Sequence, residues 1–81
     1  MPGFFFSAVL FRTIMVSILI NGDLQLIEPN TTVADLLNRL KMNPKFLAVE
    51  LNRRVVPRTE HGQTRLAADD RLEIVTLVGG G

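Results

Sequence analysis

The chain has 81 residues, of which 47% are hydrophobic and 21% charged, and this composition is typical of a single small globular domain. The net charge is +1, so the chain lacks the concentrated positive charge that is typical of a nucleic-acid-binding protein. The absence of cysteine excludes disulfides, thiolate metal sites and a cysteine nucleophile. A core this small leaves little room for an internal catalytic pocket, which favours a carrier or binding module over an enzyme. The lack of cysteine is compatible with the reducing cytoplasm, and we expect the protein there.

The first fourteen residues, "MPGFFFSAVLFRTI", form an apolar start that the rest of the pattern does not need. The apolar run from Phe4 to Ile20 covers 17 residues, the lower limit for a membrane span, and Arg12 interrupts it. Neither a basic n-region nor a cleavage site typical of a signal peptide is clear. We expect residues 1–14 to be a poorly structured extension without stable membrane insertion, and Met15 to be a natural start. The alternatives are packing on the domain or on a second copy, and membrane contact.

A β-hairpin is predicted at the start of the domain. Apolar residues alternate along Val16–Ile20, which is the period of a strand. Asn21-Gly22 supplies the two positive φ angles that a type I′ turn requires. Residues 23–28, "DLQLIE", then read as the returning strand.

An amphipathic helix of about three turns is predicted to follow. Thr32 is a favourable N-cap, and Asp35 approximates the third-position partner of a capping box. Asn43-Pro44 stops the helix. The apolar stripe consists of Val33, Leu36, Leu37 and Leu40.

Three further strands are predicted in the second half. They cover residues 46–52, the short stretch 55–57 after a turn at Arg53-Arg54, and residues 71–78 after a turn at Asp69-Asp70. Residues 58–64 are polar and irregular, so we expect His61 to be exposed to solvent. The adjacent aspartates are interpreted as turn formers and not as metal ligands.

The order β-β-α-β-β-β predicts an α+β fold of the β-grasp type. We expect a mixed sheet of four to five strands, with the first and last strands parallel in the middle and one main helix on one face. This domain covers residues 15–78 and precedes a flexible tail, residues 79–81. Its predicted core contains Val16, Ile18, Ile20, the helix stripe, alternate residues of the third strand, Leu72 and Ile74.

The chain closes with "LVGGG", where the last strand leads directly into three glycines. Glycine has no Cβ, so such a tail can thread a narrow channel and approach a phosphate closely. We predict that Gly79 and Gly80 form this passage, and that the α-carboxylate of Gly81 is the reactive group in a partner's active site. A frayed terminus or a leftover linker is the alternative.

A docking surface is predicted beside the tail. Leu19, Val75 and Leu77 fall on the sheet face opposite the helix, where exposed apolar side chains suit a partner. The alternative is that the N-terminal extension or a loop covers them.

From Met15 to Gly81, 67 of 81 residues, the chain resembles the ThiS family of ubiquitin-like sulfur carriers in thiamine biosynthesis. The resemblance rests on "ILINGD" in the first hairpin, "TTVADLL" at the helix start, "ELNRRVVPR" around the fourth strand and "LAADDRLEIVTLVGGG" at the end. Residues 1–14 depart from the family pattern.

The resemblance implies a carrier that is not itself an enzyme and binds no cofactor of its own. A ThiF-like E1 adenylyltransferase would use ATP and Mg²⁺ to adenylate Gly81, and a sulfur donor system would convert it to a thiocarboxylate. The thiazole synthase ThiG would then take the sulfur. The alternatives are a molybdopterin-synthase small subunit, against which the ending argues mildly, another ubiquitin-like sulfur carrier, or a β-grasp interaction module with no such chemistry.

Overall fold

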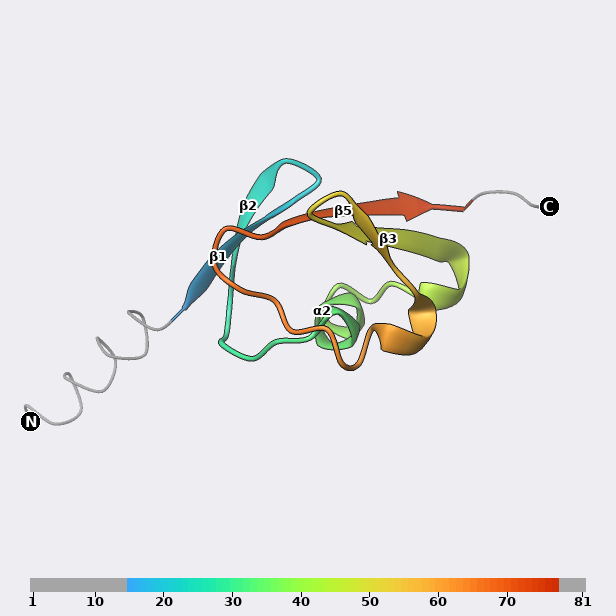
Figure 1. The fold of residues 1–81 in the computed structure, drawn as a ribbon, viewed down its shortest axis with the longest axis horizontal. Helices are drawn as coiled ribbons and strands as arrows, with labels where there is room; N and C mark the ends of the chain where they lie inside the picture. The colour runs from blue at the N-terminus through green and yellow to red at the C-terminus, as the bar shows by residue number, and fades with distance from the viewer. Residues whose placement is uncertain (1–14, 78–81) are drawn as a thin grey trace, which may run out of the picture.

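The computed structural model describes residues 15–77, and the predicted N-terminal extension, Val78 and the glycine tail lie outside them. One sheet has the strand order β2-β1-β5-β3-β4 (Figure 1). β1 and β5 are parallel neighbours, and the other pairs are antiparallel. This is the predicted β-grasp topology. The elements are β1 (Val16–Ile20), β2 (Asp23–Ile27), α2 (Val33–Arg39), η1 (Pro44–Phe46), β3 (Leu47–Leu51), β4 (Arg54–Val56), η2 (Arg58–Glu60) and β5 (Arg71–Thr76).

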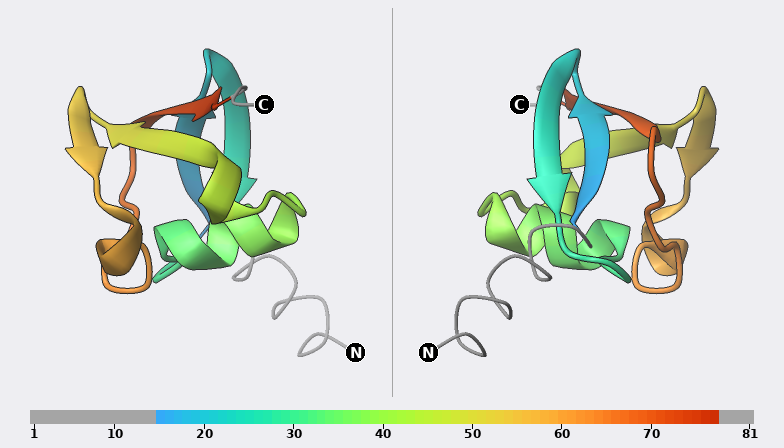
Figure 2. Two further views of the ribbon diagram at one scale, coloured as in Figure 1. Left: turned by 90° about the vertical axis from the view of Figure 1, so that its right-hand side faces the viewer. Right: turned by 90° about the vertical axis from the view of Figure 1, so that its left-hand side faces the viewer.

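The core fills the space between the sheet and α2, which lies across one face of the sheet (Figure 2). The two central strands contribute Ile18, Leu72 and Ile74 to it, as predicted. Val16 and Ile20 are only partly buried but pack against the same cluster. The sequence prediction did not place Ile27 and Leu66 in the core. The buried hydrophobic residues are Ile18, Ile27, Val33, Leu36, Leu37, Leu47, Val49, Val56, Leu66, Leu72 and Ile74.

The helix begins as predicted but ends earlier. The Thr32 side chain accepts a hydrogen bond from the N–H of Asp35, and the Asp35 carboxylate accepts one from the N–H of Thr32, which completes the capping box. Leu40 is the C-cap and 41% of it is exposed, so its predicted place in the core is wrong. The chain turns at Lys41, which has a φ of 58°, and Met42 packs against the core instead.

This C-terminal turn satisfies the last helix carbonyls as a Schellman motif does. The N–H of Met42 donates to the carbonyl of Leu37 at 2.9 Å, and the N–H of Lys41 donates to that of Asn38 at 3.1 Å. Lysine occupies the left-handed position that glycine usually takes, and this accounts for a helix end that the sequence pattern did not reveal.

Both hairpins turn on two residues with positive φ. Asn21 and Gly22 have φ values of 50° and 88°, which confirms the predicted turn. The second turn consists of Asn52 and Arg53, with φ values of 52° and 70°. The predicted turn at Arg53-Arg54 was therefore one residue late, because Arg54 already pairs with Leu51. An asparagine at the first turn position is the feature that both hairpins share.

His61 is buried, with 5% of its surface exposed, so the prediction of a solvent-exposed histidine is wrong. Its loop is polar in sequence but packs against the start of α2. The N–H of Ala34 donates to the His61 carbonyl at 3.0 Å, and that of Val33 donates to the Thr64 carbonyl at 2.9 Å. The His61 ring lies with Nε2 3.1 Å from the carbonyl oxygen of Val56, which makes Nε2 the protonated donor.

Candidate functional site

The segment that leads to the glycines is an extension of the central strand. β5 pairs with β3 from Leu51↔Leu72 to Leu47↔Thr76, and the N–H of Leu77 donates to the carbonyl of Phe46 at 2.7 Å. On its other side β5 pairs with β1 over two positions only, Leu19↔Arg71 and Ile20↔Leu72. Beyond the end of β1, the strand therefore continues along β3 alone, in the same direction in which β1 runs (Figure 1).

The Asn21 side chain holds β5 where β1 ends. Its Oδ1 accepts a hydrogen bond from the N–H of Ile74 at 2.8 Å, and its Nδ2 donates to the Ile74 carbonyl at 3.2 Å. Asn52 acts similarly from the second hairpin, because its Oδ1 accepts from the N–H of Arg71 and its Nδ2 donates to Asp70 Oδ1, both at 3.0 Å. Both asparagine turns thus tie β5 to its neighbours through side chains.

The adjacent aspartates form a turn, as predicted. Asp69 has a φ of 69°, and Asp70 Oδ2 accepts a hydrogen bond from the N–H of Ala67 at 2.7 Å. Among residues 15–77, no three or more histidine, aspartate or glutamate side chains are grouped to hold a metal ion.

Val75 and Leu77 lie in an exposed apolar surface on the sheet face opposite α2. Residues paired directly across strands share a face, which places Ala48 beside Val75. Phe46, the last residue of η1, is level with Leu77 through their main-chain hydrogen bond. The exposed fractions of the large side chains are 53% for Val75, 56% for Leu77 and 58% for Phe46. We name Phe46, Ala48, Val75 and Leu77 the tail patch.

Leu19 belongs to a different apolar surface. It pairs with Leu24 on β2, and Leu26 lies two residues further on the same face. Leu24 and Leu26 are 66% and 60% exposed. We name Leu19, Leu24 and Leu26 the hairpin patch. Because Leu19 is level with Arg71, it lies about 13 Å along β5 from Val75. The structure therefore unites two of the three predicted docking residues and separates the third.

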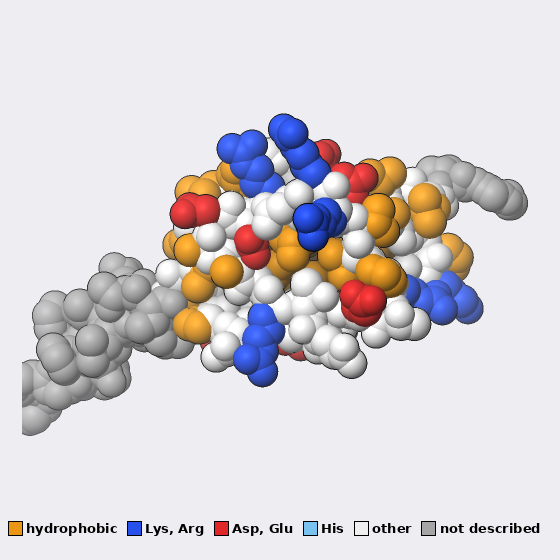
Figure 3. Space-filling model, viewed as in Figure 1, with side chains coloured by type: hydrophobic (Ala, Val, Ile, Leu, Met, Phe, Trp, Pro, Cys, Tyr) orange, Lys and Arg blue, Asp and Glu red, His pale blue; other side chains and the backbone are white. Residues whose placement is uncertain are grey.

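Between the two patches, the paired positions on this face are occupied by Arg71, Glu73 and Glu50. In the view of Figure 3, basic and acidic side chains lie close together along the upper margin of the molecule. Glu50 and Glu73 are direct cross-strand partners, and neither forms a salt bridge within residues 15–77. Like charges in this position are destabilising. The sequence pattern indicated the face of each strand residue but not the register of β3 against β5, so it could not find this acidic pair or place Phe46 level with Leu77.

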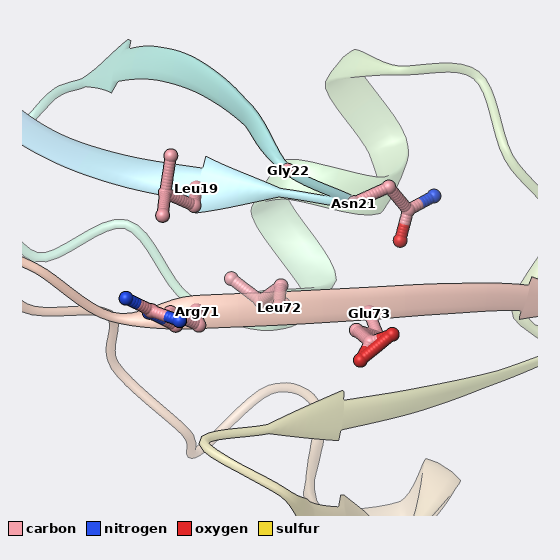
Figure 4. A pocket seen from close by; sticks show the side chains of 6 residues that line it. All are labelled: Leu19, Asn21, Gly22, Arg71, Leu72 and Glu73. Atoms are coloured by element: carbon pink, nitrogen blue, oxygen red, sulfur yellow. The ribbon is translucent and has the colours of Figure 1, made fainter.

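A shallow hollow of about 380 Å³ lies on this face between β1 and β5 (Figure 4). It is open to solvent and combines one cation, Arg71, with one carboxylate, Glu73. Its lining comprises Leu19, Asn21, Gly22, Arg71, Leu72 and Glu73. Such a surface suits contact with a larger partner better than enclosure of a small substrate.

The fold defines a ubiquitin-like β-grasp domain whose central strand leads to the glycine tail. Residues 18–81 match the model of the ThiS family, and this match covers most of the chain. The chain belongs to the ThiS family of small ubiquitin-like carrier proteins. In the part of the chain that the structure describes, no helix is long and apolar enough to cross a membrane.

A solved structure supports the assignment. The crystal structure of the thiamine biosynthesis protein ThiS from Geobacter metallireducens superimposes with a TM-score of 0.72 at 28% sequence identity. The superposition covers 82% of this chain and 100% of that one.

Curated relatives fall into two groups. The uncharacterized protein ycf40 of Pyropia yezoensis is 41% identical over 66 residues, which are 82% of this chain and 93% of that protein. A thiazole synthase from Magnetococcus marinus is 40% identical over 62 residues, or 76% of this chain and 19% of that enzyme. A thiazole synthase from Paramagnetospirillum magneticum is 35% identical over 66 residues, 82% of this chain and 20% of that enzyme. This chain thus spans about a fifth of the length of these two thiazole synthases.

Proposed function

We propose that this protein is a sulfur carrier of thiamine biosynthesis whose reactive group is the α-carboxylate of Gly81. The observation that carries the proposal is the path of β5, the central strand, which runs past the tail patch toward the glycines. A rigid strand would fix where the tail begins, while the glycines would thread a partner's active site.

Activation would begin in an adenylating enzyme of the ThiF type. A carboxylate oxygen of Gly81 attacks the α-phosphorus of ATP, and pyrophosphate leaves with the Mg²⁺ that balances its charge. The product is an acyl adenylate, in which the glycine carbonyl carbon has become electrophilic. ATP and Mg²⁺ are bound by the enzyme, and the carrier contributes only its tail.

Sulfur transfer would follow by displacement. A sulfide-level nucleophile attacks the acyl carbon, the bond to the phosphate breaks, and AMP leaves with the electron pair. The tail now ends in a thiocarboxylate. A thiazole synthase of the ThiG type then incorporates that sulfur into the thiazole ring. The two curated thiazole synthases with a stretch similar to this chain support this choice of partner.

The tail patch would dock these enzymes. Its side chains are more than half exposed at Phe46, Val75 and Leu77, and it borders the segment that both enzymes must receive. The Glu50–Glu73 pair at its margin would favour a partner that offers lysine or arginine there. Docking would then relieve a repulsion that the isolated domain retains.

Intact mass spectrometry tests the proposal. The purified chain is incubated with an adenylating enzyme, ATP, Mg²⁺ and sulfide, after its mass has established that Gly81 carries the carboxyl terminus. We expect a mass increase equal to the difference between sulfur and oxygen, which requires ATP and disappears when Gly80 and Gly81 are deleted. An unchanged mass with every adenylating enzyme tried would refute the carrier function.

Two matched variants test the docking surface. Leu77→Asp places a charge in the tail patch, and Leu24→Asp places the same charge at a similarly exposed leucine of the hairpin patch. We expect slower adenylation of Leu77→Asp only, with circular dichroism showing both variants folded. Equal rates for the two would remove the tail patch from the docking surface.

The receiving enzyme is tested separately. The thiocarboxylated chain is offered to a thiazole synthase and to a molybdopterin-synthase large subunit, and sulfur loss from the carrier is followed by mass. Turnover by the molybdopterin enzyme alone would place the carrier in that pathway and leave the adenylation chemistry intact.

A further inference from the structure

Within residues 15–77, no segment pairs with the outer edge of β2. Its central residues Leu24, Gln25, Leu26 and Ile27 carry no charge and include no proline. The opposite edge, β4, has only three residues, begins with Arg54 and is followed by Pro57, which are features that discourage strand pairing. Figure 2 shows these two strands at the two ends of the sheet. Only one of the two edges is suited to accept another strand.

The hydrogen bonds of β1 reveal which β2 groups point outward. The Leu19 N–H donates to Asp70, and the Ser17 carbonyl accepts from Asp69, so these two β1 residues direct their main chain toward β5. Their antiparallel partners are Leu24 and Leu26. Because bonded and non-bonded pairs alternate in an antiparallel ladder, the N–H and carbonyl groups of both leucines point away from the sheet. The residues with outward main chain are therefore the same two that expose large apolar side chains.

We propose that the β2 edges of two copies of this chain pair antiparallel about a two-fold axis at Gln25. In this register Leu24 lies opposite Leu26 of the second copy, so each leucine pair exchanges its outward N–H and carbonyl groups. All five residues of Asp23–Ile27 are paired, which joins the two five-stranded sheets into one. The side chains of Leu24 and Leu26 from both copies then form one apolar cluster.

Charge and register favour a second copy as the occupant. In the proposed pairing Asp23 faces Ile27 of the second copy, and Glu28 faces Gly22, so no two carboxylates are opposed. A shift that centres the pair on Asp23 would oppose two aspartates and shorten the ladder. The interface is isologous, as two-fold symmetry requires. It is also small, so we expect a weak, concentration-dependent dimer.

The dimer leaves the tail patch accessible. β1 lies between β2 and β5, and in Figure 1 the end of β5 points away from β2. The pairing is therefore independent of the proposed sulfur chemistry, and its failure would leave that proposal intact.

Sedimentation velocity of the full chain, at concentrations up to about 1 mM, measures the association. Hydrogen exchange of the Leu24 and Leu26 amides should slow as concentration rises. The Gln25 amide serves as an internal reference, because Gln25 is already paired with Ile18 within one copy. A monomer at the highest concentration overturns the proposal. Amides that become protected only when thiazole synthase is added would assign the edge to that enzyme instead.

Paired substitutions identify the register. Leu24→Lys combined with Leu26→Lys opposes lysines and should raise the dissociation constant about tenfold or more. Leu24→Lys combined with Leu26→Glu places each new lysine opposite the new glutamate of the second copy only if the axis lies at Gln25. This attraction should restore association at low salt. Val55→Lys is the matched control, since Val55 has the same exposed fraction, 66%, as Leu24 but lies on the other edge. Dissociation by Val55→Lys, or insensitivity to the double lysine change, refutes the interface.

Discussion

Asn21 forms the first hairpin turn through its main chain and binds β5 through its side chain, and Asn21→Gly removes only the second contribution. Glycine adopts the φ of 50° without strain, so the turn is retained, but the two hydrogen bonds to Ile74 are lost. At about 1 kcal/mol for each bond, the free energy of unfolding should fall by about 2 kcal/mol. For a domain of this size that corresponds to roughly 8–16 °C in melting temperature.

Urea unfolding followed by circular dichroism measures the effect. Asn30→Gly is the control, because Asn30 also has a positive φ, 67°, and its side chain makes no hydrogen bond to the described residues. It carries the same entropic penalty of a new glycine, which cancels in the comparison. Exchange of the Ile74 amide should accelerate in Asn21→Gly alone. Equal stability of the two variants would refute the view that the Asn21 side chain anchors the last strand.

Three further changes test the local structure. Lys41→Gly should raise the free energy of unfolding by about 1 kcal/mol in urea titrations, because lysine occupies a left-handed position with a φ of 58°; a loss of stability would contradict this. The hydrogen bonds from Thr32 lower the pKa of Asp35 below 3.8, so its contribution is complete above that pH and is lost as the pH falls through the lowered value. Asp35→Asn should therefore be less stable at neutral pH and lose less stability in melts taken below about pH 4, and an acid profile parallel to the wild type would exclude this coupling. Glu73→Gln should gain roughly 0.2–1 kcal/mol by removing the repulsion of Glu50, whereas unchanged melting would show that solvent already screens the pair.

Periodicity was sufficient to predict the fold. The alternating residues of the strands, the Thr32 cap and the Asn21-Gly22 turn act within a few residues of one another, so they can be recognised locally. Leu40 and His61 were misplaced for the opposite reason. The exposure of Leu40 follows from the left-handed conformation of Lys41, which the intrinsic preference of lysine does not predict. The burial of His61 follows from the main-chain hydrogen bonds between its loop and the start of α2.

The candidate site was predicted in part. Alternation along β5 correctly placed Val75 and Leu77 on the exposed face. Leu19 was grouped with them because it shares that face, although the β1–β5 register sets it beside Arg71. Register arises from the whole sheet, and one strand's pattern cannot reveal it. The glycines themselves lie outside the described residues, so their role stays a prediction.

The parallel pairing of β1 with β5 has a consequence for synthesis. β1 and β5 are the first and last strands of the described domain and are neighbours in the sheet, so a ribosome must release the chain through Thr76 before the centre of the sheet can close. A truncated product that stops before Arg71 lacks β5, the strand that pairs with β1 and β3 and forms two hydrogen bonds with the Asn21 side chain at Ile74. Such a product cannot complete the core, and cellular proteases remove unfolded chains. Folding would thus select for chains that extend at least through β5, because shorter products are degraded before they can bind a partner.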